Sequence, residues 1–274
     1  MTMTSSPSTA SANNLLISPL IGKLLLVALA YFSGAKLGLA LPYVGSHITL
    51  VWLPTGIAVA ALLRWGNRCW PGIFLAAMAV NYSVDTNPLL DVSIALGNTL
   101  APLLSVWLLR RFKFHAVIDK ANDILFLIVA AAIGMLVSAS VGVGSLVLFD
   151  VLPLQTARAA WLSWWAGDFV GVLLAAPLLL NASVAEFKKL VTRRLEILVW
   201  CAVMLASSWG VFFLNHDENS YSLPLTFVVL PLIVWSAMRF GLMASSLGVL
   251  IPVLIAAWAT APKRCYKTAR RAPN

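Results

Sequence analysis

The 274-residue sequence has few charged residues and few cysteines, and both shortages exclude classes of protein. Only 11% of the residues are Asp, Glu, Lys or Arg, whereas soluble proteins carry about 25%. The three cysteines, Cys69, Cys201 and Cys265, lie far apart and form no CxxC pair, so neither a zinc site nor a disulfide framework is expected. A nucleic-acid-binding domain and a sizeable soluble catalytic domain are also excluded.

The sequence contains long apolar runs, and 61% of its residues are hydrophobic. Because about 20 apolar residues suffice to cross a bilayer as a helix, the runs predict an all-α, polytopic transmembrane bundle of about eight or nine spans. Pro54 and Pro71 interrupt or open the two short runs, which favours tilted or partly re-entrant helices there. The runs are Leu20–Leu41, Ile48–Leu63, Trp70–Val84, Leu89–Leu109, Ile124–Phe149, Trp161–Leu180, Leu195–Leu214, Leu223–Met238 and Leu242–Ala261.

The polar ends divide the chain into three parts. Residues 1–18 are rich in Ser, Thr and Asn and contain no Lys or Arg, whereas a signal peptide begins with basic residues. We therefore expect a disordered tail over 1–18, a membrane domain over 19–262 and a basic tail over 263–274.

The basic residues predict the orientation. If the amino terminus lies inside, the inner loops hold almost every loop Lys and Arg, and the outer loops hold only Arg158 together with five of the ten acids. The positive-inside rule therefore places the amino terminus in the cytoplasm, and we expect the bacterial inner membrane as the location. The inner basic residues are Arg64, Arg68, Arg110, Arg111, Lys113, Lys120, Lys188, Lys189, Arg193, Arg194 and Arg239.

The carboxyl-terminal tail conflicts with this orientation. After a ninth span, Lys263, Arg264, Lys267, Arg270 and Arg271 would emerge on the outer side. Either the last two runs do not both cross, or a further span is missing; we favour a truncated chain.

Small residues predict close helix packing. Ala130, Gly134, Ser138 and Gly142 recur every four residues, and Gly34 and Gly38 form a GxxxG pattern. Such faces let helix backbones approach one another within a bilayer, so we interpret both as structural.

A carboxylate lies inside the sixth run. Asp168 follows Trp161 by seven residues, which at 1.5 Å per residue is roughly 10 Å. A charge in mid-helix costs at least about 2.5–3.5 kcal/mol, so it has a partner, a cavity or a function. Trp161, Trp164, Trp165 and Asp168 share one helical stripe. The alternatives are a structural carboxylate that pins two helices and an interfacial tryptophan belt.

Lys36 and Asn98 complete a candidate signal-sensing set with Asp168 and the three tryptophans. Lys36 and Asn98 lie in the outer halves of the first and fourth runs, at a depth similar to that of Asp168. We expect Lys36 and Asp168 to be coupled in an outward-opening polar pocket bordered by Asn98 and the stripe. Alternatively, Lys36 extends its ammonium outward to the membrane surface.

Catalytic and metal-binding patterns are not expected. His47, His115 and His216 lie in separate loops without further ligands at metal spacing, and we interpret each as a solvated loop residue. We find no Ser-His-Asp set and no HExxH motif, so no catalytic residue, cofactor or metal is predicted.

Several segments together resemble the MASE1 family of bacterial integral-membrane sensory domains, over about Leu20–Ala261. They are VWLPTGIAVAALLRWG at 51–66, WPGIFLAAMAVN at 70–81, GNTLAPLLSVWLLRR at 97–111, WLSWWAGDFVGVLLAAPLLL at 161–180 and WSAMRFG at 235–241. The resemblance implies signal input to diguanylate cyclases, cyclic-di-GMP phosphodiesterases or histidine kinases. No GGDEF-like, EAL-like or kinase-type segment is present, so the family's enzymatic output is not expected in this chain.

The sequence thus predicts a non-enzymatic sensor module in the lipid bilayer. Its expected partners are a second copy of the chain or a separate signalling output protein, and no nucleic acid; its ligand is unknown. A small-solute transporter is the alternative, since transporters also place charges and broken helices within the membrane. A remnant of a longer gene is a third hypothesis.

Overall fold

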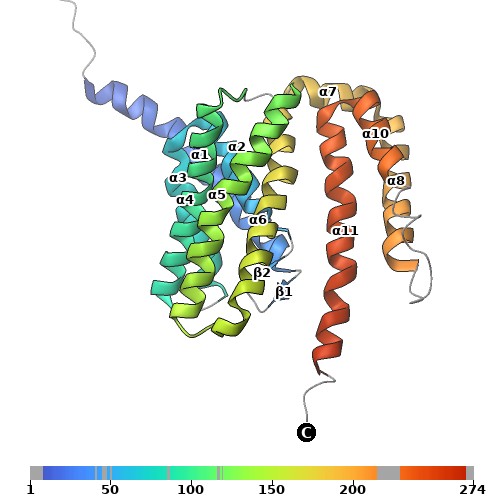
Figure 1. The fold of residues 1–274 in the computed structure, drawn as a ribbon. Coiled ribbons are helices and arrows are strands. Elements are labelled where there is room, and N and C mark those ends of the chain that lie inside the picture. Colours follow the sequence, from blue (N-terminus) through green and yellow to red (C-terminus); the bar gives the residue numbers. More distant parts are fainter. Residues whose placement is uncertain are drawn as a thin grey trace, which may run out of the picture.

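The fold of the chain is a set of helices that stand side by side, with two short strands after the first helix (Figure 1). The computed structural model describes residues 9–40, 42–44, 48–49, 51–84, 87–115, 118, 120–214 and 229–269. The elements are α1 (Thr9–Leu39), β1 (Pro42–Val44), β2 (Ile48–Thr49), α2 (Leu53–Trp65), η1 (Asn67–Cys69), α3 (Trp70–Tyr82), α4 (Pro88–Arg111), α5 (Ala121–Leu148), α6 (Leu154–Asn181), α7 (Val184–Thr192), α8 (Arg194–Trp209), η2 (Gly210–Leu214), α10 (Val229–Phe240) and α11 (Leu242–Ala269).

Proline and capping residues mark the starts of several helices. Pro54 and Pro71 each lie in the first turn of their helix, where the missing N–H has no intrahelical acceptor to lose. Asn87 caps α4 by accepting hydrogen bonds from the N–H groups of Leu89 and Leu90. The two prolines therefore start α2 and α3 rather than break them.

Six helices among the described residues are long and apolar enough to cross a membrane, which confirms a helical membrane fold. Two further apolar helices, Leu53–Trp65 and Val229–Phe240, are shorter. A helix of 13 residues spans only about 20 Å, whereas the hydrocarbon core is about 30 Å thick. The expected eight or nine spans are therefore not confirmed. The six are Pro19–Leu39, Pro88–Arg111, Asn122–Leu148, Leu154–Asn181, Arg194–Phe213 and Leu242–Ala259.

Two differences from the sequence expectation concern the region between α1 and α2 and the ends of the chain. β1 and β2 form a small antiparallel pair, with Pro42 opposite Thr49, and β2 occupies the first two residues of the run Ile48–Leu63 that was expected to be helical. Helix α1 begins at Thr9 and α11 ends at Ala269, outside the proposed domain limits of 19–262. The division into tails and membrane domain stays a prediction.

The predicted small-residue faces are confirmed as packing surfaces. Ala130, Gly134, Ser138 and Gly142 are all buried. A Cβ on Gly134 would collide with Ser105 of α4, and one on Gly142 would collide with the Trp164 ring of α6. Gly34 lies against Ile57 of α2 in the same way. Small residues therefore allow α1, α4, α5 and α6 to approach their neighbours closely.

The helices form two packed groups. Helix α2 packs against α1, α4 and α6 inside the first group, which spans α1 to α6. The second group contains α8, α10 and α11, whose buried residues surround Trp200 and Met204. Helix α11 contacts α6 and joins the two groups, and α7 connects their ends (Figure 1).

Candidate functional site

Asp168 lies at the middle of α6 and is almost completely buried, with 1% of its surface exposed. The helix begins at Leu154, seven residues before Trp161, so Asp168 is farther from the helix end than the apolar run suggests. Neither carboxylate oxygen has a hydrogen-bond partner, and no ion pair with Asp168 occurs among the described residues. An unpaired carboxyl group in such a place is costly, and it marks a candidate site.

Three donor side chains approach this carboxylate, but their hydrogen bonds go to other acceptors. They belong to Thr55, Ser138 and Trp164. Thr55 Oγ1 donates to the carbonyl oxygens of Trp52, at 2.7 Å, and of Asp168 itself, at 3.2 Å. The side chains that could donate hydrogen bonds to the Asp168 carboxylate thus lie beside it, but they donate to other oxygen atoms.

A hydrogen-bonded chain links three helices beside Asp168. The indole N–H of Trp164 donates to Ser138 Oγ at 3.1 Å, and Ser138 Oγ donates to Asn98 Oδ1 at 2.9 Å. Asn98 and Ser138 are 2% and 0% exposed. This chain runs from α6 through α5 to α4, so a change at one residue can alter the contacts of all three helices.

Tyr31 of α1 is a further buried polar group at this site. Its hydroxyl has no hydrogen-bond partner and lies near Asp168, Trp52 and Asn98. The sequence analysis did not select Tyr31, because a tyrosine within an apolar run gives no distinctive signal. Ser138 and Thr55 were also not selected, since small hydroxyl residues are common in packed membrane helices.

A small cavity of about 20 Å³ adjoins Asp168. A space of roughly 10–15 Å³ can hold one water molecule, so this cavity fits a water-sized group rather than a sugar or an amino acid. It is lined by Leu39, Thr49, Trp52, Val80, Asn81, Val84, Asn98, Trp164 and Asp168. The site therefore combines α1, α3, α4 and α6 around an unsatisfied carboxyl group.

The start of α2 is fixed against α6 next to Asp168. The N–H of Trp52 donates to the carbonyl oxygen of Gly167 at 3.0 Å. A Cβ on Gly171 would collide with the Trp52 carbonyl oxygen, and a Cβ on Gly56 would collide with the Gly171 carbonyl oxygen. Glycine at both positions lets the two backbones touch, and this contact positions Thr55 beside Asp168.

The three predicted tryptophans all connect α6 to α5. Trp161 donates to Ser140 Oγ at 3.1 Å, and Trp165 donates to the Ala132 carbonyl oxygen at 2.9 Å, in addition to the bond from Trp164. Trp164 alone is buried, at 8% exposure, and it alone lines the cavity. Trp161 and Trp165 thus join two helices and do not line the cavity.

Lys36 forms no ion pair with Asp168 among the described residues, so the expected coupling is not seen. Its exposed ammonium donates a 2.6 Å hydrogen bond to Ser83 Oγ at the end of α3 and lies 5.4 Å from the centre of the Phe32 ring. Lys36 is in the last turn of α1, whereas Asn98 and Asp168 lie near the middles of their helices. Tyr31 and Leu39 of the same helix do reach the site of Asp168, so Lys36 differs from them in the face of α1 that carries it.

The histidines give no metal centre within the described residues. His115 is exposed and contacts Asp123 Oδ1 through its Nδ1 at 3.4 Å. His47 and His216 lie outside the described residues.

Comparison with known proteins gives the family. The MASE1 family model matches residues 23–268. The probable diguanylate cyclase DgcE of Escherichia coli (strain K12) is 26% identical over 237 residues, which cover 84% of this chain and 20% of that protein. The chain thus spans about a fifth of this relative's length. No solved structure matches it significantly. Since the family model covers most of the sequence, the chain belongs to the MASE1 family of membrane sensory domains.

Proposed function

We propose that this chain is the signal-input module of a cyclic-di-GMP signalling system in the bacterial inner membrane, and that Asp168 is its sensing group. The observation that carries the proposal is a buried carboxyl group without partners, at a junction of packed helices in a MASE1 protein. Sites that must respond to a signal often keep such costly groups, because a fully satisfied group gives a stimulus little to change.

Helix α6 is the element through which we propose the signal passes. It carries Asp168 at its middle and contacts α2, α5 and α11. A proton or other water-sized polar group that changes the charge or hydrogen bonding of Asp168 would alter the balance between these contacts. Helix α11, the last described helix, would then transmit the change to an output domain or partner. We infer that residues 1–274 themselves do not catalyse a reaction.

We propose a cytoplasmic amino terminus, and the first prediction tests it. The arginines of the presumed inner loops support this orientation, because they meet at one end of the bundle. Arg64 donates to the carbonyl oxygens of Leu179 and Ala182 at the end of α6, and Arg110 donates to the Leu62 carbonyl oxygen. We expect alkaline phosphatase fused after Arg111 to be inactive.

The same enzyme fused near Asp85 or Asp217, which lie outside the described residues, should be active. Immunoblots should show equal amounts of each fusion. High phosphatase activity after Arg111 would reverse the orientation.

The second prediction tests the function. We would replace the segment of DgcE that matches this chain with residues 1–269 and measure cyclic-di-GMP in cells. During acidification or respiratory inhibition, we expect the nucleotide level to change several-fold. A matched fusion that carries unrelated membrane helices should not respond.

Equal levels from the two fusions in all conditions would contradict signal input. The transporter alternative would instead be supported by solute uptake into proteoliposomes that contain the purified chain, if that uptake depends on Asp168.

A further inference from the structure

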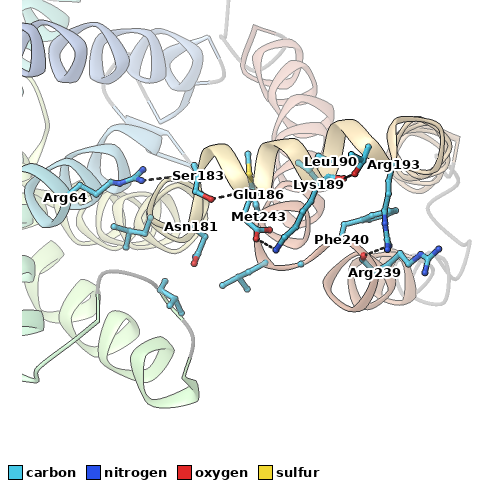
Figure 2. Close-up of a pocket in the computed structure, with 16 residues that line it drawn as sticks. Arg64, Asn181, Ser183, Glu186, Lys189, Leu190, Arg193, Arg239, Phe240 and Met243 are labelled. Atoms are coloured by element: carbon cyan, nitrogen blue, oxygen red, sulfur yellow. Dashed lines mark hydrogen bonds and ion pairs between the residues drawn. The ribbon is translucent and has the colours of Figure 1, made fainter.

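A second site lies at the end of the bundle where α6, α7, α10 and α11 meet. It is a cleft of about 670 Å³, far larger than the cavity at Asp168. Figure 2 shows Arg64 reaching the cleft from α2, with Lys189 on α7, Arg193 just after α7 and Arg239 at the end of α10. Four basic side chains and one acidic side chain, Glu186, thus line one cleft.

Two of the four basic groups form no ion pair among the described residues. Lys189 pairs with Glu186, and Arg239 pairs with Glu196 at 2.9 Å, whereas Arg64 and Arg193 form no ion pair among the described residues. Arg193 donates to the carbonyl oxygen of Arg239 at 3.1 Å, and Arg64 donates only to carbonyl oxygens. A guanidinium group has five N–H donors, so both retain donors for an anion.

An apolar groove continues from this cleft toward the middle of the helices. The groove has a volume of about 430 Å³, and it shares Ile118 and Leu242 with the basic cleft. Along α11 it extends from Leu242 to Val249, seven residues, which correspond to roughly 10 Å. Its other walls are Ile124, Leu127 and Ile128 of α5, Leu173, Leu174 and Pro177 of α6, and Ile233, Val234, Ala237 and Met238 of α10.

We propose that the cleft and the groove together bind one anionic phospholipid. The phosphate group contacts Arg193 at the membrane surface, Arg64 adds positive charge at the other end of the cleft, and an acyl chain fills the groove between the two helix groups. Basic clefts between membrane helices suit acidic head groups, and guanidinium groups bind phosphate through paired hydrogen bonds. The lipid then bridges α6 and α11. This site is separate from Asp168, so its failure would leave the proposed function standing.

The experiment measures lipid binding to the purified full chain in neutral detergent by native mass spectrometry. The probes are dioleoylphosphatidylglycerol, dioleoylphosphatidylcholine with the same chains, and glycerol 3-phosphate as a head group without chains. We expect phosphatidylglycerol to bind about tenfold more tightly than phosphatidylcholine. Glycerol 3-phosphate should not displace it at equal concentration.

Two sets of variants separate head-group from chain binding. Arg193→Gln should remove most of the preference for phosphatidylglycerol, whereas Arg111→Gln, an exposed arginine outside the cleft, should keep it. Ala237→Trp fills the groove and should weaken both lipids, whereas Ala202→Trp on the exposed surface of α8 should not.

Circular dichroism and size-exclusion chromatography identify any variant that fails to fold. If Arg193→Gln fails, Arg193→Lys replaces it and should weaken the preference, because an ammonium group cannot form the paired hydrogen bonds of a guanidinium group. Equal binding of the two lipids to the wild type would overturn the proposal. An equal loss of the phosphatidylglycerol preference in Arg111→Gln would also overturn it. Displacement of the lipid by glycerol 3-phosphate at equal concentration would overturn it as well, because it would indicate a site for soluble anions.

Discussion

Replacing Gly171 with alanine is expected to destabilise the folded chain by about 3 kcal/mol or more, since overpacking typically costs 1–3 kcal/mol and here the obstacle is backbone. The added Cβ would collide with the carbonyl oxygen of Trp52, which cannot rotate away as a side chain can. Separation of α2 from α6 would also break the bond from the Trp52 N–H to the Gly167 carbonyl oxygen. Thermal unfolding in detergent and the yield of monodisperse protein measure the effect.

Gly144→Ala is the matched control for this prediction. Gly144 also lies within a membrane helix, but no atom outside its own helix lies within 4 Å of an added Cβ. Alanine should be neutral or slightly stabilising there, because it favours helix by up to about 1 kcal/mol over glycine. A Gly171→Ala protein as stable as Gly144→Ala would contradict the close contact of α2 and α6.

Asp168→Asn is expected to raise the thermal stability of the chain. Both carboxylate oxygens are buried without hydrogen bonds, and asparagine has the same shape without the charge. An unpaired buried charge costs several kcal/mol, so removing it should stabilise the fold by about 1 kcal/mol or more. Groups retained for function commonly cost stability in this way.

The structural alternative predicts the opposite change in the unfolding temperature. If the carboxylate pins two helices together, Asp168→Asn should lower the unfolding temperature. Asp150→Asn is the control, because Asp150 is exposed and its backbone φ of 58° is one that asparagine also adopts readily. The control should unfold at the wild-type temperature.

The sequence identified the parts of the site whose chemistry is rare in a membrane. Asp168 stood out because charges seldom occur within apolar runs, and Asn98 for a similar reason. The stripe that includes Trp164 was also visible, since helical spacing places its members on one face. All three line the cavity found in the structure.

The partners of these residues could not be predicted, because they depend on how the helices pack. Tyr31 and Ser138 resemble ordinary residues of membrane helices until packing brings them to Asp168. Lys36 was assigned to Asp168 from depth alone, but its nearest polar partner is Ser83, at the end of a helix beside α1. Depth along separate helices does not determine which faces meet.

The number of spans is not confirmed for a related reason. A run of apolar residues shows that a segment is buried in protein or lipid, but not that it crosses the bilayer. Helix α2 is such a case: most of its side chains are buried among α1, α4 and α6, yet it has only 13 residues. The run Leu223–Met238 was likewise counted as a span from composition, and the described helix there is Val229–Phe240.

The central claim is that Asp168 senses the signal, and the DgcE fusion with Asp168→Asn tests it most directly. Cyclic-di-GMP should be measured in cells that carry the wild-type, Asp168→Asn or Asp150→Asn fusion at equal protein levels, with and without the stimulus that changes the wild-type level. We predict that Asp168→Asn holds the nucleotide at one level in both conditions, while Asp150→Asn responds as the wild type does. An Asp168→Asn fusion that responds with the wild-type amplitude would contradict the claim.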